Sequence, residues 1–142
     1  MQITRTGSAV WQGGLKDGKG SISTQSGALS AYPYGFATRF EGLPGSNPEE
    51  LIAAAHASCF TMALSLILGN AGFKADQMDT KAEITLAKDG DGFSITKSHL
   101  TLRAKIPGID DAKFKELTGM AEKGCPVSKV LKAEISLDAA LV

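Results

Sequence analysis

The amino-acid sequence predicts an α+β fold in a single domain that spans residues 1–142. Two observations support this prediction. Short alternating segments lie near both ends of the chain, and one long apolar helix lies between them. The expected order is a β-rich segment, the long helix, two strands, a helix, a short helix and a last strand. Because strands and helices do not alternate one by one, this order indicates α+β architecture rather than a doubly wound sheet.

The first part of the chain, residues 2–40, is predicted to form antiparallel strands. Three pairs of turn-forming residues separate the short strands: Gly13-Gly14, Asp17-Gly18 and Ser26-Gly27. The segment YGFATRFEG, residues 34–42, also alternates. Its two expected faces carry Phe36, Thr38 and Phe40 on one side and Ala37, Arg39 and Glu41 on the other. We therefore expect a strand here.

A long helix is predicted from about residue 48 to residue 70. Asn47 suits the N-cap, Pro48 the first helical position, and Glu50 the reciprocal partner of a capping box. Glu49 and Glu50 also suit the positive end of the helix dipole. Gly72 can close the helix.

The middle of this helix is apolar on all sides. From Leu51 to Leu68 the only acidic or basic residue is His56, and a run of that length is at the lower limit for a membrane span. The run contains serine and threonine and has no Lys/Arg cluster at its ends, which favours a central buried helix instead. One domain of this size covers such a helix on one side only, so we expect a dimer and no membrane.

The remainder of the chain is predicted to contain four elements. They are a hairpin near residues 81–106 with an Asp-Gly-rich turn, an amphipathic helix at residues 108–124, a short helix after residue 125 and a strand at residues 133–142. Phe114, Leu117 and Ala121 form the apolar face of the amphipathic helix, and Gly124 ends it.

Charge and cysteine content restrict the function. There are 15 Lys+Arg and 15 Asp+Glu residues, so no basic excess indicates a nucleic-acid partner. The first residues lack the apolar core of a signal peptide, which predicts a cytoplasmic protein. The chain has two cysteines, and in a reducing compartment they are expected to be catalytic, redox-sensing or simply buried rather than a structural disulfide.

Each cysteine has two interpretations. Cys59 lies inside the apolar helix, where it is either a small core residue or a functional thiol that needs a charge beside it. Cys125 lies between Gly124 and Pro126, at or next to a helix N-terminus, where free N–H groups favour a thiolate. The other interpretation is that Cys125 only caps the helix and has no chemical role.

Three further residues could support thiol chemistry. Arg39 is either on a solvated strand face or turned into a pocket to hold a thiolate. Glu49 precedes Cys59 by ten residues, about 15 Å of helical rise, so any joint action would require Glu49 of a partner chain. His56 lies one turn before Cys59 and is either a base or a satisfied core histidine. With His99 in a strand, no metal site is expected.

Three segments together resemble the OsmC/Ohr family of thiol peroxidases. They are YGFATRFEG, NPEELIAAAHASCF and GCPVSKVLKAEI, and the resemblance covers essentially the whole chain. It implies an intertwined homodimer in which antiparallel sheets wrap long buried central helices, with two active sites at the interface. It also implies reduction of organic hydroperoxides, and of hydrogen peroxide less readily, in osmotic and oxidative stress.

The resemblance also implies roles for individual residues. Cys59 matches the peroxidatic cysteine, Cys125 the resolving cysteine, and Glu49 the glutamate before the central helix. In the OsmC branch the arginine lies in the segment that matches TRFEG, hence Arg39, and Arg5 ranks well below it. No cofactor or metal is expected, and the reductant is expected to be a thiol or lipoyl group. The alternatives are a redox sensor and a hydrophobic-ligand-binding dimer with little turnover.

Overall fold

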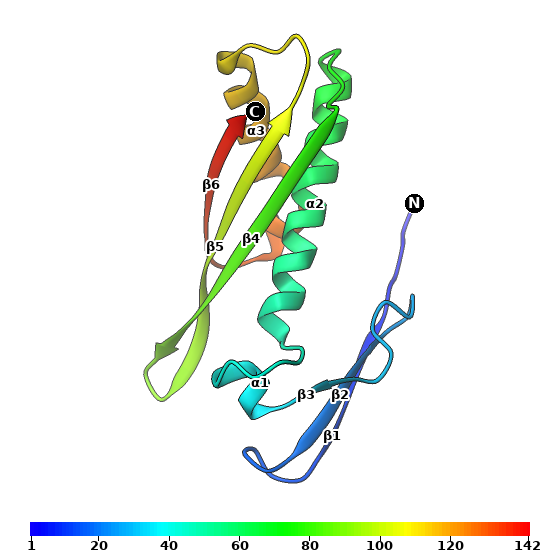
Figure 1. The fold of residues 1–142 in the computed structure, drawn as a ribbon, viewed down its shortest axis with the longest axis vertical. Coiled ribbons are helices and arrows are strands. Elements are labelled where there is room, and N and C mark those ends of the chain that lie inside the picture. The colour runs from blue at the N-terminus through cyan, green and yellow to red at the C-terminus, as the bar shows by residue number, and fades with distance from the viewer. The chain divides into compact units, whose positions relative to one another are not determined.

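The computed structural model describes all residues, 1–142, and divides into two compact units, Met1–Leu51 and Ile52–Val142. The first unit contains a three-stranded antiparallel sheet in the order β1-β2-β3 (Figure 1). Its strands are β1 (Gly7–Gln12), β2 (Lys19–Thr24) and β3 (Tyr32–Tyr34). Gly13 and Gly27 have positive φ angles of 94° and 80° in the intervening turns, so the predicted strands and turns up to residue 34 are confirmed.

The segment after β3 differs from the prediction, because Phe36–Phe40 forms the short helix α1 and not a strand. The Thr38 hydroxyl accepts a hydrogen bond from the Gly35 N–H at 2.9 Å, which caps the first turn. The rings of Phe36 and Phe40, four residues apart, lie with centroids 4.9 Å apart. The predicted strand faces were therefore wrong: apolar residues at this spacing fit one helical face as well as one strand face.

The long helix α2 spans Pro48–Asn70 and confirms the predicted boundaries. At its start, the Glu50 N–H donates to Asn47 Oδ1 at 2.8 Å, and the Glu50 carboxylate accepts from Asn47 Nδ2 at 3.0 Å. At its end, the Phe73 N–H donates to the Leu68 carbonyl at 2.8 Å, and Gly72 has a φ of 84°. This is the Schellman arrangement that a glycine after the last turn predicts.

The second unit contains a three-stranded sheet in the order β4-β5-β6. Its strands are β4 (Gln77–Asp89), β5 (Gly92–Lys105) and β6 (Glu134–Leu141). The predicted hairpin is confirmed, because β4 and β5 pair antiparallel. β6 pairs parallel to β5, so this sheet is mixed and the expectation of purely antiparallel sheets was wrong. The reason is the connection through two helices, which returns the chain in the same direction.

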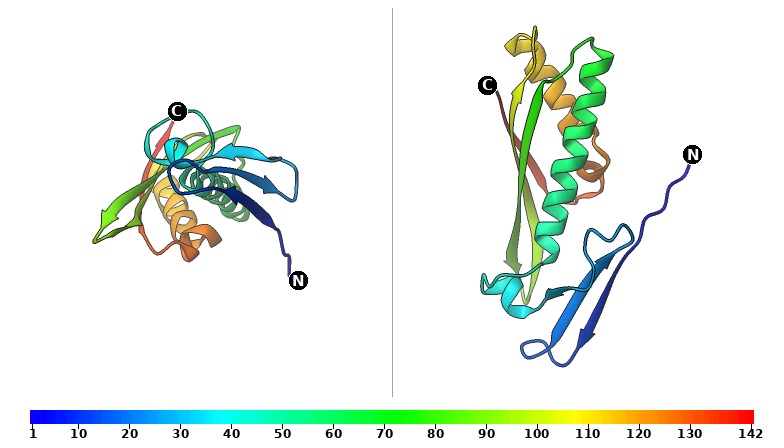
Figure 2. Two further views of the ribbon diagram at one scale, coloured as in Figure 1. Left: turned by 90° about the horizontal axis from the view of Figure 1, so that it is seen from below. Right: turned by 45° about the vertical axis from the view of Figure 1, so that its right-hand side comes forward.

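Those two helices are α3 (Asp111–Gly124) and α4 (Pro126–Val130). Asp110 caps α3 by accepting the Lys113 N–H at 2.7 Å. Leu100, Leu102 and Ala104 alternate along β5 and so lie on one face of the sheet, where they form one core with residues of α2 and α3. The core consists of Phe60, Leu64, Leu68, Leu100, Leu102, Ala104, Ile106, Phe114, Leu117, Ala121 and Cys125. Figure 2 shows α2 running along the sheet of the second unit.

One stripe of α2 is buried within the chain: His56, Phe60, Leu64 and Leu68, at a spacing of four residues. Met62 and Leu66 on another side are 76% and 67% exposed. By length and composition alone, α2 could also cross a membrane, a criterion that core helices of soluble proteins meet as well. A single chain therefore covers only part of this apolar helix.

Candidate active site

The two cysteines, 66 positions apart in sequence, meet in the second unit. Cys59 lies in α2, and its side chain contacts the Cys125 side chain and the backbone N–H of Val127 in α4. Both cysteines are free thiols, and Cys125 is fully buried. The fold thus brings the two thiols beside each other, with Cys59 packed against the core that contains Cys125.

The surroundings of Cys59 favour its protonated form. Burial raises the pKa of the Cys59 thiol above the ordinary value of 9.0, and the neighbouring Cys125 raises it further. The Val127 N–H acts in the opposite direction, because it stabilises a thiolate by hydrogen bonding. No positive side chain is among the causes of this pKa shift. A reactive thiolate at Cys59 therefore requires a cation in addition to these groups.

Cys125 occupies the N-cap of α4, as the Gly-Cys-Pro sequence predicts. Its sulfur accepts the Ser128 N–H at 3.3 Å and lies 3.2 Å from the Ser128 hydroxyl. Its own N–H donates to the Ala121 carbonyl at the end of α3. Two consecutive helices thus hold this sulfur, and one N–H group is directed at it.

His56 is the fully buried histidine of α2. Its Nδ1 lies 2.6 Å from Ser98 Oγ, and its Nε2 lies 2.7 Å from Ser128 Oγ. Burial lowers the pKa of His56 below 6.5. His56 is therefore buried, and both of its ring nitrogens have hydrogen-bond partners. Neither serine was predicted from the sequence, although Ser128 stands at the third position of a helix that a cysteine caps.

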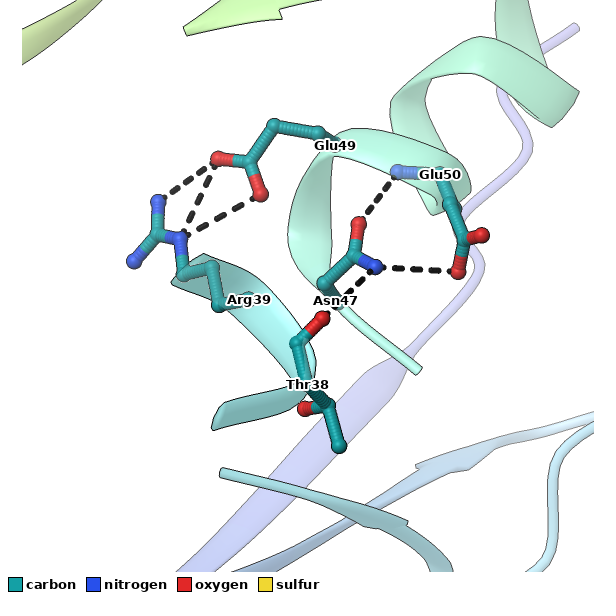
Figure 3. A network of polar contacts seen from close by, with 5 residues as sticks. All are labelled: Thr38, Arg39, Asn47, Glu49 and Glu50. Carbon is teal, nitrogen blue, oxygen red and sulfur yellow. Dashed lines mark hydrogen bonds and ion pairs between the residues drawn. The ribbon is translucent and has the colours of Figure 1, made fainter. Parts of the chain in front are cut away.

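Arg39 and Glu49 form the charged part of the candidate site, in the first unit (Figure 3). Arg39 Nε lies 3.2 Å from both carboxylate oxygens of Glu49, and Nη2 lies 2.7 Å from Oε1. The Glu49 side chain is only 12% exposed. Arg39 lies on the helix α1 and not on a strand, so the predicted strand face was wrong; its side chain is 36% exposed and reaches Glu49 in the first turn of α2.

An apolar hollow of about 200 Å³ lies beside this ion pair. It is formed by residues of the N-terminal sheet and of α1, namely Trp11, Leu15, Tyr34, Gly35, Phe36, Arg39 and Phe40. Arg39 thus borders both a carboxylate and an apolar surface. Arg5, the other arginine before α2, bonds only the carbonyl of the adjacent Thr4.

The structure contains no group of three or more His, Cys, Asp or Glu side chains that could hold a metal ion. The candidate chemistry of the second unit therefore consists of two thiols in contact, one N–H group directed at each sulfur, and a buried histidine. The candidate chemistry of the first unit is the Arg39 guanidinium, which the Glu49 carboxylate holds in place.

Comparisons with known proteins identify the family of this chain. Residues 40–140 match the family model described as OsmC-like protein. The chain is 56% identical over 138 residues to peroxiredoxin OsmC of Escherichia coli (strain K12), which covers 97% of this chain and 96% of that protein. It is 32% identical over 99 residues to the organic hydroperoxide resistance protein OhrB of Bacillus subtilis (strain 168), covering 68% of this chain and 70% of that protein.

The crystal structure of Bacillus subtilis OhrB is also similar, with a TM-score of 0.73 at 28% sequence identity. The alignment covers 95% of this chain and 98% of that chain. An OsmC-like protein from Mycoplasma pneumoniae shares the fold, with a TM-score of 0.76 at 16% identity. From the family match and the near full-length similarity, this chain belongs to the OsmC-like protein family.

Proposed function

We propose that this protein is a cysteine-based hydroperoxide reductase that converts organic hydroperoxides, and hydrogen peroxide less well, to alcohols or water. Cys59 is the peroxidatic cysteine and Cys125 the resolving cysteine. The observation that carries the proposal is the contact between the two free thiols. The similarity to peroxiredoxin OsmC and to organic hydroperoxide resistance proteins supports it.

The reaction proceeds in three steps. The Cys59 thiolate attacks the terminal peroxide oxygen, the O–O bond breaks, and the alkoxide takes a proton and leaves as alcohol. Cys59 is now a sulfenic acid. Cys125 attacks this sulfur, water leaves, and a disulfide forms within the chain. An external thiol or lipoyl-type dithiol then reduces the disulfide, so no bound metal, haem or flavin is required.

Arg39 and Glu49 supply the charge in this proposal. The planar guanidinium holds the Cys59 thiolate and the peroxide oxygens, and Glu49 fixes its orientation through two hydrogen bonds to Nε and one to Nη2. The apolar hollow beside Arg39 receives the alkyl part of the substrate. Because Glu49 precedes Cys59 by ten residues, about 15 Å of helical rise, the pair acts on the Cys59 of another chain.

The protein therefore acts as an intertwined homodimer with two active sites at the interface. The exposed Met62 and Leu66 of the otherwise apolar α2 support this assembly. In the dimer, the long helices are central and the sheets surround them. Its role is defence against osmotic and oxidative stress in the cytoplasm.

The proposal is tested by intact mass and free-thiol count on the reduced protein after one equivalent of cumene hydroperoxide or of hydrogen peroxide. The expected result is loss of two hydrogens and of both thiols, with Cys59 joined to Cys125 in the same chain, and faster oxidation by the organic substrate. Retention of both thiols would contradict the peroxidase.

The raised pKa of Cys59 favours a second candidate, a ligand-binding dimer with inert thiols. Alkylation by iodoacetamide near neutral pH distinguishes the two. Slow alkylation of Cys59 in the native protein, compared with the denatured protein, would support the ligand-binding dimer. Rapid alkylation of Cys59 in the native protein would support the peroxidase.

A further inference from the structure

A continuous chain of buried hydrogen bonds leads from the sheet to the resolving cysteine. Ser98 Oγ lies 2.6 Å from His56 Nδ1, and Ser128 Oγ lies 2.7 Å from His56 Nε2. The Ser128 hydroxyl also lies 3.2 Å from Cys125 Sγ. His56 and Ser98 are fully buried, and all members of the chain belong to the second unit.

These distances fit both histidine tautomers, and one of the two directions of donation carries a proton from the thiol to the histidine. The Cys125 S–H donates to Ser128 Oγ, the Ser128 O–H donates to His56 Nε2, and the Nδ1–H of His56 donates to Ser98 Oγ. No buried side-chain nitrogen or oxygen lacks a partner. In this tautomer the histidine presents a free electron pair to the serine that contacts the thiol.

We propose that His56 is a positioning residue for the resolving step, which accepts the Cys125 proton through the Ser128 hydroxyl as the Cys125 sulfur attacks Cys59. This inference rests on the proposed peroxidase function. The S–O bond of the Cys59 sulfenic acid breaks as the S–S bond forms. The departing hydroxide and the proton lost by Cys125 together make one water, and His56 holds that proton in between. No further oxidant or base is needed.

The environment of His56 suits a proton acceptor. Burial lowers its pKa, so the imidazole is neutral near pH 7 and returns a proton readily. Two thiols belong to its surroundings: Cys59 follows His56 by three residues on α2, and Cys125 contacts Ser128. On β5, the neighbour His99 points to the opposite face of the sheet, and on α4, Lys129 is exposed.

The second histidine of the chain provides a matched control. His99 Nδ1 lies 2.6 Å from Ser136 Oγ, the same distance as in the His56–Ser98 pair, but the structure places no thiol beyond it. Loss of a histidine–serine hydrogen bond can thus be separated from loss of the connection to Cys125.

The experiment compares the reduced wild-type protein with His56→Gln, Ser128→Ala and His99→Gln after one equivalent of cumene hydroperoxide. Trapping by dimedone follows the Cys59 sulfenic acid, and the free-thiol count follows the disulfide, between about pH 5 and pH 9. We expect His56→Gln and Ser128→Ala to form the sulfenic acid at the wild-type rate and the disulfide about 100-fold more slowly. We expect His99→Gln to match the wild type in both steps.

The pH profile is the readout that a structural role would not change. In the wild type, disulfide formation is expected to slow at acidic pH, where His56 is protonated and accepts no further proton. In His56→Gln the part of the profile that follows the titration of His56 is lost, and only the dependence on the Cys125 thiolate remains. If His56→Gln does not fold, Ser128→Ala decides, because it keeps the N–H that donates to Cys125. Wild-type disulfide rates and pH profiles in the variants would overturn the inference. Retention of both thiols in the wild type, with no sulfenic acid in any variant, would instead refute the peroxidase proposal.

Discussion

The two units of the chain differ in what they bury. In the first unit, Met1–Leu51, the only buried residue is Ser46, and every residue of β1 is exposed. In the second unit, Ile52–Val142, lie all eleven buried core hydrophobic residues. The second unit thus has a core of its own, whereas the first has a sheet without one. Because a small sheet without a hydrophobic core is marginally stable at best, the first unit needs another surface to cover it.

The chemistry is divided in the same way. The apolar second unit contains both thiols, and burial there raises the pKa of Cys59. The first unit, which has no buried core, contains the Arg39–Glu49 ion pair. Burial orders the thiols but works against ionisation, so the proposed peroxidase must combine both units.

The largest expected effect comes from the thiols themselves. Cys59→Ser should abolish peroxide reduction, because a serine hydroxyl is not ionised near neutral pH. Cys125→Ser should still consume one equivalent of hydroperoxide and then stall, or oxidise further to the sulfinic acid. Steady-state consumption of cumene hydroperoxide with a dithiol reductant measures both. Normal turnover by Cys125→Ser would contradict its resolving role.

A smaller loss of activity is expected when the positive charge of Arg39 is kept but its planar guanidinium is replaced by an ammonium group. Arg39→Lys removes the planar fork that bonds both oxygens of Glu49, and we expect kcat/KM for cumene hydroperoxide to fall about 10- to 100-fold. The matched control is Arg103→Lys, since Arg103 also bonds both oxygens of a carboxylate, Asp138, but is one of an exposed pair. An equal fall of kcat/KM in both variants would contradict a specific role of Arg39 in the active site.

Local sequence rules predicted the elements whose ends carry their own caps. Asn47, Pro48 and Gly72 gave the ends of α2, and the Gly-Cys-Pro sequence placed Cys125 at a helix start. The resemblance to the OsmC/Ohr family was confirmed by the family match and by the 56% identity. The helix ends depend on adjacent residues, and the family resemblance depends on the sequence as a whole, so both can be predicted without the structure.

Other features depend on contacts between distant residues, and local rules could not give them. Phe36–Phe40 was predicted as a strand because its apolar spacing fits both periodicities, and the hydrogen bond of Thr38 decides for the helix. The meeting of Cys59 and Cys125 depends on how α2 packs beside α3 and α4. Ser98 and Ser128 become notable only once His56 is seen between them.

The stability of the two units should differ as their burial does. Leu64→Ala removes a side chain with no exposed surface and should lower the free energy of unfolding by about 2–5 kcal/mol. Val10→Ala, in the first unit, removes a side chain that is 59% exposed and should lower it by less than about 0.5 kcal/mol in the dissociated chain. Urea denaturation at low protein concentration measures both. A large loss for Val10→Ala there would mean that the first unit has its own core.

The second unit should also give the protein a pH-dependent stability. The pKa of His56 is lowered from 6.5 by burial, so below pH 6.5 the unfolded chain binds a proton that the folded chain does not. Stability is therefore full above pH 6.5 and falls as the pH drops below it, by at most about 1.4 kcal/mol per pH unit. Urea midpoints measured on both sides of pH 6.5 test this, and His56→Gln should remove the His56 contribution whereas His99→Gln should leave it in place. If His56→Gln kept the wild-type slope, the acid sensitivity would have to arise elsewhere, and the buried histidine would be no proton-linked part of the core.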